Sequence, residues 1–251
     1  MNLSKTKLTL YSRLNSRKQR EKLGLFAAEG DKCVSDTIRH FTTEAIVVME
    51  DNDTAIERYA DYPVFTVTES EMRKMSHFQS LPEVIAIYKI PERPEFSKEE
   101  FASGLTLMLD GIQDPGNLGT IMRIASWFGV ARIVIGNGCA DPFNPKAVQS
   151  SMGAIGMVRF YQSDLLSIIE SNPDIPVCGT LLDGTDIYTT PLSLPSFVVM
   201  GNEGNGISEN IRRHVNLPLL IPSFAKGPHA ESLNVAAATA ITVSEFMRRK
   251  I

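Results

Sequence analysis

The sequence predicts an α/β protein with two domains, and three observations lead to this prediction. The chain has 251 residues, which is enough for one large domain or two smaller ones. Short apolar strands alternate with helical patterns in both halves, as they do in α/β folds. Between the halves lies a polar segment, residues 91–104, that contains two prolines. We therefore expect a domain at 1–92, a linker at 93–103 and a second domain at 104–251.

The first half is predicted to contain helices and strands in alternation. The expected helices lie near residues 10–22, 30–40, 52–60 and 68–77. The expected strands lie near residues 24–29, 45–49, 63–67 and 84–90. Alternation of this kind over about 90 residues predicts a layered α/β/α domain.

The second half contains short and almost uninterrupted apolar runs, at residues 105–109, 131–136, 176–182, 196–201 and 217–222. Such runs are typical of parallel strands that helices cover on both faces. A long Ala-rich helix from residue 232 closes the chain, and the basic residues at its end suit the negative pole of a helix dipole. These basic residues are Arg248, Arg249 and Lys250.

The composition excludes several classes of protein. Apolar residues make up 43% of the chain and charged residues 22%, which excludes a disordered chain, a collagen-like repeat and a coiled-coil rod. No window holds the roughly 18 apolar residues of a membrane helix, and the N-terminus lacks the apolar core of a secretory signal. We expect a cytoplasmic protein. Cys33, Cys139 and Cys178 lack the spacing of a metal or redox site, so we expect buried thiols and no bound metal.

The net charge of −4 argues against nucleic-acid binding, but the distribution of charge argues for it. Residues 1–22 contain seven of the 25 lysines and arginines and only one acidic residue, Glu21. Within this stretch Arg13, Arg17 and Arg20 are spaced by four and three residues, which predicts that one helical face presents all three. Such a face can dock phosphates; the alternative is an ordinary solvated face.

Three loops each follow a predicted strand, at the sheet edge where open α/β folds bind ligands. The first loop, residues 110–130, turns into a helix that carries Asn117 and Arg123. The unpaired N–H groups of a helix start, together with an arginine, can hold an anion. The alternative for this loop alone is a capped helix with a surface arginine.

The second and third loops have their own signals. Residues 201–208 hold three glycines around Glu203, which allows a sharp turn and a close approach to a ligand, although a tight turn alone would look the same. Residues 221–240 lead through Ser232 to Asn234 at the start of the last helix. Ser232 could be a simple N-cap, whereas Asn234 in the first turn of an apolar helix is expected to be buried and to need partners.

Together the loops closely resemble the three motifs of the SpoU (TrmH-like) ribose methyltransferases, which belong to the SPOUT class. Their order, intervals and strand–loop–helix contexts match across residues 104–251. The matching residues are Asn117-x-Gly119-x-x-x-Arg123, Gly201-x-Glu203-x-x-Gly206, and Ile221-Pro222 followed by Ser232-Leu233-Asn234.

The rest of the chain resembles the family less closely. Residues 1–92, with their basic helix and the phrase FAAEGDKCV, look like the family's accessory substrate-binding domain, which is similar to small ribosomal RNA-binding proteins. The third loop departs from the common pattern, in which Met follows Ile-Pro and fewer residues precede Ser-Leu-Asn. Residues 223–229 are therefore expected to shape the cofactor edge differently.

The resemblance implies an activity and an assembly. S-adenosylmethionine would methylate a ribose 2′-hydroxyl in RNA, and ribosomal RNA is the expected substrate because an accessory domain is present. The C-terminal domain would form a deep trefoil knot and pair as a homodimer. A terminal helix that is apolar around most of its girth, including Val235 and Ile241, also favours a partner copy; the alternative is burial within its own domain.

The resemblance also assigns site residues. The family view makes Arg123 a base, but a guanidinium stays protonated, so we expect a phosphate clamp that orients the sugar. Asn117 and Ser232 would position the hydroxyl, and Glu203 would hold Arg123 or a neighbouring amide. The implied catalytic set is Asn117, Arg123, Glu203, Ser232 and Asn234. The cofactor would be held largely by the backbone of Thr180, Leu181, Leu182, Gly201, Ile221 and Leu233.

Other functions are weighed against this one. A transfer-RNA methyltransferase and a non-catalytic ribosome-assembly factor that binds RNA are the alternatives, and the intact catalytic set disfavours the second. A nucleotide-dependent oxidoreductase is disfavoured because the dinucleotide fingerprint is missing.

The sequence also predicts the burial or exposure of four aromatic side chains and one histidine. Trp127 and Phe128 are expected in the core, whereas Phe143 and Phe224 lie in loops where they could stack on an RNA base. His229 is expected at the surface.

Overall fold

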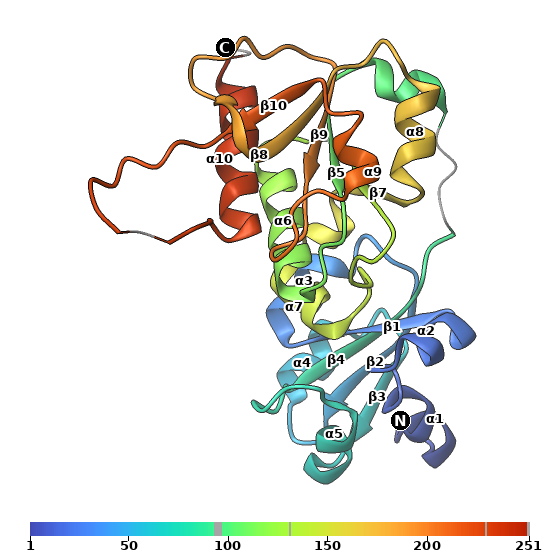
Figure 1. Cartoon of the computed structure of the whole chain (residues 1–251). Helices are drawn as coiled ribbons and strands as arrows, with labels where there is room; N and C mark the ends of the chain where they lie inside the picture. The colour runs from blue at the N-terminus through green and yellow to red at the C-terminus, as the bar shows by residue number, and fades with distance from the viewer. Residues whose placement is uncertain (93–96, 131, 229, 250–251) are drawn as a thin grey trace. The chain divides into compact units, whose positions relative to one another are not determined.

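The computed structural model of the chain describes residues 1–92, 97–130, 132–228 and 230–249. They divide into two compact units, each built on its own sheet (Figure 1). Unit 1 comprises Met1–Glu92 and Asp141–Met157, and unit 2 comprises Arg93–Ala140 and Val158–Ile251. The predicted α/β class is confirmed, and every predicted strand overlaps an observed one.

Unit 1 is built on a mixed sheet with the strand order β1-β4-β2-β3. β4 pairs antiparallel with β1 and β2, and β2 pairs parallel with β3. Ala27 and Ile87 belong to one apolar cluster, while the alternating Phe26 and Tyr88 contact each other on the opposite face. The strands are β1 (Leu25–Glu29), β2 (Thr43–Met49), β3 (Val64–Val67) and β4 (Val84–Lys89).

Short helices cover both faces of this sheet. Tyr11 and Met72, from α1 and α5, join the cluster of Ala27. On the other face α3 packs against β1 and β4, and its Thr37 hydrogen-bonds to Tyr88 of β4. The helices within residues 1–92 are α1 (Lys5–Tyr11), α2 (Arg17–Leu23), α3 (Asp31–Thr37), α4 (Asp53–Arg58) and α5 (Glu69–Met75).

The prediction of one continuous helix over residues 10–22 is wrong. α1 ends at Tyr11 and α2 begins at Arg17. Ser12 donates its hydroxyl to the carbonyl of Thr9 at 3.1 Å, and serines that bond to nearby backbone favour helix ends over helix interiors. Leu14, between the two helices, is completely buried. Burial of this leucine and the local hydroxyl bond outweigh the helical periodicity.

The segment Asp141–Met157 belongs to unit 1, although its sequence position places it inside the predicted domain 104–251. The Phe143 ring lies 4.8 Å from the Phe26 ring, between centroids. Gly153 approaches Asp36 so closely that a Cβ on the glycine would lie 2.6 Å from the Asp36 Cβ. The segment contains α7 (Pro145–Ser151) and η2 (Ala154–Gly156). Close packing over separations of more than 100 residues explains why the sequence pattern did not reveal this grouping.

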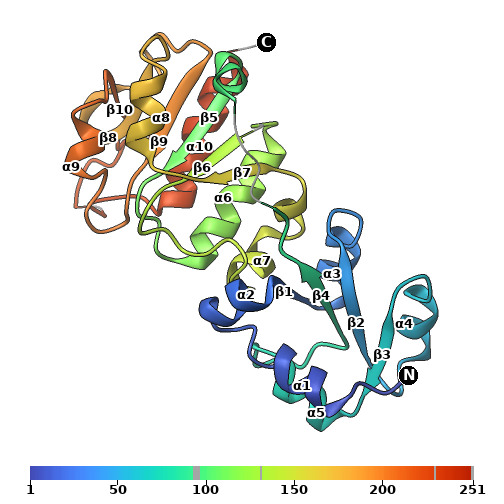
Figure 2. The ribbon, with the colours of Figure 1, turned by 90° about the vertical axis from the view of Figure 1, so that its right-hand side faces the viewer.

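Unit 2 is built on a sheet in which all neighbouring strands are parallel, in the order β10-β8-β9-β5-β6-β7 (Figure 2). β7 was not predicted, because its sequence RFYQ is short and half polar. The strands are β5 (Leu105–Leu109), β6 (Arg132–Ile135), β7 (Arg159–Gln162), β8 (Val177–Asp186), β9 (Ser196–Met200) and β10 (Leu217–Leu220).

Helices lie on both faces of this sheet. α6 (Pro115–Trp127) and α10 (Val235–Arg248) pack side by side on one face (Figure 1). On the other face η1 (Lys98–Ala102), α8 (Leu165–Ser171) and α9 (Glu209–Arg212) share an apolar cluster with Met108 and Phe197 of the sheet. No described helix is long and apolar enough to cross a membrane.

The strand order places a switch point between β5 and β9. From β5 the sheet continues through β6 and β7 in one direction, and from β9 through β8 and β10 in the other. Ligands of open α/β sheets bind beyond the carboxyl ends of the strands at such a point. The loops that follow β5 and β9 both start there.

Candidate active site

The first loop brings Asn117 into the first turn of α6. The Asp114 carboxylate caps this helix and accepts a hydrogen bond from the Asn117 backbone N–H at 2.8 Å, and Pro115 follows at a position where no N–H is needed. Arg123 lies further along α6 and is exposed. Its guanidinium has no hydrogen-bond or ion-pair partner among the described residues, so its donors are available to a ligand.

The second loop is tied to the first by Asn202, a residue that the sequence analysis missed. Its amide donates to the carbonyl of Gly111 at 2.8 Å, and its Oδ1 accepts from the backbone N–H groups of Gly204 and Asn205 at 2.9 and 3.0 Å. A Cβ at Gly201 would lie 2.4 Å from the neighbouring backbone, so only glycine fits there. In the sequence, an asparagine next to a glycine, here Asn202 after Gly201, indicates a loop that is held by the asparagine side chain.

The third loop ends on Asn234, which is the N-cap of α10. Its Oδ1 accepts from the backbone N–H groups of Ala236 and Ala237 at 3.0 and 3.3 Å. The expectation of a buried amide in the first turn is wrong, because Asn234 is exposed and lies just before the helix. Ser232 is not the cap; it is exposed, and no described residue hydrogen-bonds to its hydroxyl.

A chain of side-chain hydrogen bonds joins the three loops. The Asn234 amide donates to the Asn117 Oδ1 at 3.0 Å, and the Asn117 amide donates to the Glu203 Oε1 at 2.7 Å. Glu203 and Asn234 are exposed, and Asn117 is half-buried. Glu203 thus holds an amide, one of the two partners expected for it, while Arg123 and Ser232 stay outside the chain. The result is a row of fixed acceptors and donors at the switch point, suited to orienting a polar group.

The residues expected to hold a cofactor lie in β8 and in the loops after β9 and β10. The pairing of β10 with β8 jumps from Pro218↔Gly179 to Leu219↔Thr185, so residues 180–184 have no opposite residue in β10. This stretch contains Thr180, Leu181 and Leu182, and its backbone polar groups need other partners. Leu182 is 76% exposed and Leu233 52%. Gly201 and Ile221 are half-buried.

The geometry of three linked loops on a parallel sheet agrees with a comparison against protein families. The model of the SpoU rRNA Methylase family matches residues 104–244, which is more than half of the chain. The chain belongs to the SpoU rRNA methylase family. A second model, the MRM3-like substrate binding domain, matches residues 6–86 of this SpoU protein.

Individual relatives agree with the family. The chain is 28% identical over 93% of its length to the 23S rRNA (guanosine(2553)-2′-O)-methyltransferase RlmP of Bacillus subtilis, of which 92% is covered. A Porphyromonas gingivalis structure described as an RNA methyltransferase of the TrmH family superposes with a TM-score of 0.87 at 37% identity, covering 99% of this chain and 100% of that one. An AdoMet-bound rRNA methyltransferase of Sinorhizobium meliloti superposes with a TM-score of 0.85 at 25% identity, covering 100% and 97%.

The basic face predicted for this SpoU protein does not include Arg20. Its side chain is 1% exposed, donates to the carbonyls of Leu14 and Asn15 at 2.7 and 2.8 Å, and forms an ion pair with Asp141. The prediction that Arg20 docks RNA together with its neighbours is therefore wrong, because the fold itself uses every part of its guanidinium. Arg13 and Arg17 are exposed.

The structure also tests the predicted burial or exposure of the aromatic side chains. Trp127 is 84% exposed and not part of the core, whereas Phe143 is 7% exposed and packed, so both expectations are wrong. Phe224 is 80% exposed, and His229 lies outside the described residues.

The thiols are placed largely as expected. Cys33 and Cys178 are buried, and burial raises the pKa of each thiol to about 12. Cys139 is partly exposed, and its Sγ accepts the backbone N–H of Ile112 at 3.2 Å.

Proposed function

We propose that this SpoU methylase transfers a methyl group from S-adenosylmethionine to the 2′-hydroxyl of a ribose in ribosomal RNA. The observation that carries the proposal is the hydrogen-bond chain from Asn234 through Asn117 to Glu203. It joins the three loops whose sequences resemble the family motifs. The relative RlmP is named as a 23S rRNA 2′-O-methyltransferase, and the Sinorhizobium meliloti structure holds AdoMet.

The proposed cofactor residues have properties that fit a nucleoside with a sulfonium group. Residues 180–184 have no pairing partner in β10, and so offer backbone donors and acceptors. Leu182 and Leu233 expose apolar side chains that a purine or ribose can cover. Thr180, Leu181, Gly201 and Ile221 would contribute backbone contacts. The bound cofactor supplies an electrophilic methyl group, so orientation is the main task of the protein.

The catalytic residues divide into positioning groups and a phosphate clamp. Asn117 and Ser232 orient the ribose hydroxyl, while Glu203 and Asn234 fix the Asn117 amide on both sides. The Arg123 guanidinium is always charged and binds a phosphate beside the target ribose. A clamp predicts that Arg123→Lys retains part of the RNA affinity that Arg123→Ala loses.

The assembly that we propose is a homodimer whose C-terminal segment forms a deep trefoil knot. On α10, which is already packed against α6, Ala237 is exposed and Ile241 half-buried. The exposed Trp127 at the end of α6 adds apolar surface for a second copy. Light scattering at micromolar concentration should give twice the mass of the chain; a monomeric mass contradicts the dimer.

We further propose residues 1–92 as the RNA-docking domain, 93–103 as the linker and 104–251 as the cytoplasmic enzyme's methyltransferase domain. The match of residues 6–86 to a substrate-binding model supports the first assignment. Arg13 and Arg17 remain as docking residues, and Lys18 and Lys22 add positive charge on α2.

The test is a map of 2′-O-methyl positions in RNA from cells with and without the gene. We expect one ribose position of ribosomal RNA to lose its methyl group, and the purified protein with S-adenosylmethionine to restore it in vitro. Loss of a transfer-RNA position instead assigns the other substrate. Unchanged maps together with no binding of S-adenosylmethionine in a titration contradict the enzyme.

A further inference from the structure

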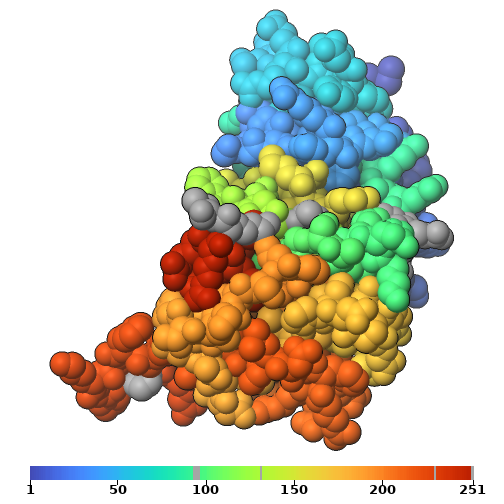
Figure 3. All heavy atoms as spheres, turned by 90° about the horizontal axis from the view of Figure 1, so that it is seen from above, coloured from blue at the N-terminus to red at the C-terminus, as the bar shows by residue number. Residues whose placement is uncertain are grey.

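The long third loop carries an exposed aromatic pair. Phe224 is 80% exposed and Tyr188 39%, and their rings stack with centroids 6.4 Å apart and planes 27° from parallel. The loop that holds Phe224 stands out from the body of unit 2 in Figures 1 and 3. Two neighbouring aromatic rings that are this open to solvent offer a flat apolar face for a planar ligand.

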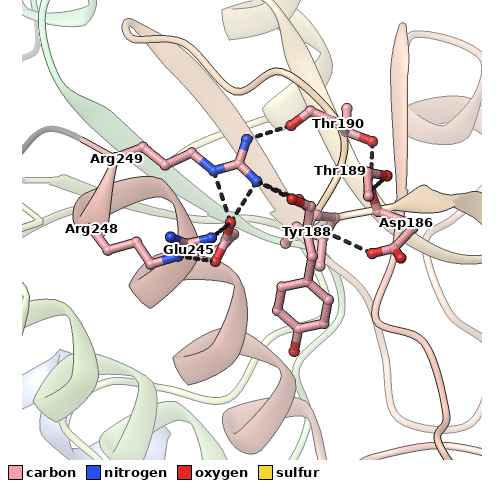
Figure 4. Close-up of polar contacts among 8 residues, drawn as sticks. Asp186, Tyr188, Thr189, Thr190, Glu245, Arg248 and Arg249 are labelled. Carbon is pink, nitrogen blue, oxygen red and sulfur yellow. Dashed lines mark hydrogen bonds and ion pairs between the residues drawn. The ribbon is translucent and has the colours of Figure 1, made fainter.

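A buried clamp fixes the backbone of Tyr188 (Figure 4). The Glu245 side chain, on α10, is 4% exposed and binds Arg248 and Arg249. Arg249 in turn donates to the carbonyls of Ile187 and Tyr188, both at 2.9 Å, and to that of Thr190. One arginine thus binds three backbone carbonyls within residues 187–190, so the Tyr188 ring projects from a rigid support while its face stays open.

Basic side chains lie near the pair, together with the carboxylates of Asp186, which accepts the Tyr188 N–H, and of Glu245. Arg248 is 60% exposed, and its pKa is raised mainly by the hydrogen bond to Glu245, with a smaller effect of Tyr188 beside it. Lys226, two residues after Phe224, is exposed as well. Cations beside an open aromatic face match a base that is attached to phosphates.

The position of the pair separates it from the reacting centre. Arg248 ends the helix that Asn234 begins, and a helix of 14 residues is about 20 Å long. Phe224 nevertheless follows the proposed cofactor residue Ile221 by only three residues. A ligand on the pair therefore lies beside the site and not within it.

We infer that Tyr188 and Phe224 form a stacking platform for an unpaired nucleobase of the RNA, several nucleotides from the ribose that is methylated. This inference rests on the proposed function. Stacking of a base on an aromatic ring is tolerant of sequence and is independent of salt to a first approximation, unlike contacts to phosphate. Glu245 and Arg249 are positioning residues that act through Tyr188.

The test uses the full-length protein and a transcript of the ribosomal RNA fragment that contains the mapped ribose, or complete rRNA transcripts where no ribose has been mapped. Phe224→Ala and Tyr188→Ala are each expected to raise the Kd for RNA about tenfold, with an unchanged dependence of Kd on salt. Phe224→Trp is expected to retain tight binding, whereas Phe224→Leu, which keeps apolar volume without a ring, is expected to lose it. Met157→Ala, which removes a side chain in unit 1 that is 56% exposed, is the matched control.

Two further measurements separate the possible outcomes. Glu245→Gln is expected to raise the Kd for RNA in the wild-type background and to add nothing in the Tyr188→Ala background, because it acts through that ring.

Wild-type RNA affinity for Phe224→Ala overturns the platform while leaving methylation by the wild-type protein untouched. A raised Kd for S-adenosylmethionine, with RNA affinity unchanged, assigns the ring to the cofactor and also overturns it. Absence of methyl transfer by the wild-type protein contradicts the proposed function, and the RNA affinities still test the platform.

Discussion

The two units use their polar side chains in opposite ways. In unit 1, Arg20 and Glu29 are 1% and 3% exposed, and groups of the same unit surround both of them. In unit 2, Glu203 and Asn234 are exposed and Asn117 is half-buried, and the three bond to one another across three loops. The buried polar groups of unit 1 stabilise its fold. The polar groups of unit 2 are fixed by their hydrogen bonds but remain open to solvent, so a ligand can reach them.

Charge and spacing in the sequence do not distinguish these two kinds of polar side chain. Arg17 and Arg20 lie on the same short helix and belong to the same basic stretch, yet one pairs with Glu21 in solvent and the other is a buried structural ion pair. Charge and spacing are identical signals for both. Burial separates them, and burial depends on Asp141, a residue far away in the sequence.

The largest effect is expected from breaking the buried ion pair of unit 1. Arg20→Ala leaves Asp141 and two carbonyls without their donor, and should lower the free energy of unfolding of unit 1 by about 3–5 kcal/mol. Hydrogen exchange of β1 and β4 amides measures this loss. Arg17→Ala is the matched control and should cost less than about 0.5 kcal/mol, because its partner is an exposed residue one turn away. Equal effects for the two variants contradict the comparison.

A second prediction concerns the exposed chain of unit 2. Asn117→Ala removes the link between Glu203 and Asn234 and should lower kcat about 100-fold, which corresponds to about 2.7 kcal/mol. The temperature of unfolding should hardly change, since Glu203 and Asn234 are exposed and Asn117 is only half-buried. Methyl transfer under saturating RNA measures the first effect and calorimetry the second. A variant that unfolds early but keeps its kcat places Asn117 among the structural residues.

A smaller effect is expected from the exposed arginines of unit 1. Reversing charge in the double variant Arg13→Glu/Arg17→Glu should raise the Kd for RNA about fivefold at low salt and flatten its salt dependence, because phosphate contacts are lost. Affinity for S-adenosylmethionine should stay unchanged. Arg213→Glu is the control, since Arg213 forms the same kind of exposed pair with Glu209 in unit 2. If the control weakens RNA binding equally, the docking surface is not specific to unit 1.

The smallest effect is a pH dependence in unit 1. Burial, with the Arg20 charge as a second cause, lowers the pKa of His77, so its neutral form is favoured in the folded state. The unfolded chain then binds the extra proton, and stability is lost as pH falls below the ordinary histidine pKa of about 6.5. His77→Asn should remove this decline between pH 7.5 and 5.5 in urea titrations. The buried Glu29, whose pKa is raised, contributes equally to both proteins and cancels in the difference. Parallel curves for the two proteins contradict the assignment.

Much of the fold follows from local patterns. The apolar runs of β5 and β9 predict parallel strands because five consecutive buried residues leave no solvent face. β7 was not predicted because polar residues, Arg159 and Gln162, lie at its two ends. It is a strand because it pairs with β6, which the sequence pattern does not show. The break between α1 and α2 depends on the burial of Leu14, which no helical periodicity reports.

The site is predictable to the extent that its residues form motifs. Asn117, Glu203 and Asn234 are singled out by their loops, but their bonds to one another cross 86 and 117 residues of sequence and need the strand order. Asn202 was missed because a side chain that organises its own loop looks like any turn residue. The exposure of Trp127, at the end of α6, likewise depends on what α6 packs against.

The grouping of Asp141–Met157 with unit 1 has a consequence for synthesis. A nascent chain released only as far as Glu92 has its four strands but lacks Asp141 and Phe143, so Arg20 has no counter-ion and Phe26 has no cover. Domains usually fold from the N-terminus as they emerge. Here β5, α6 and β6 of unit 2 leave the ribosome before unit 1 can close. The two folding events are therefore interleaved in time, and a pause in translation before residue 157 should leave both of them incomplete.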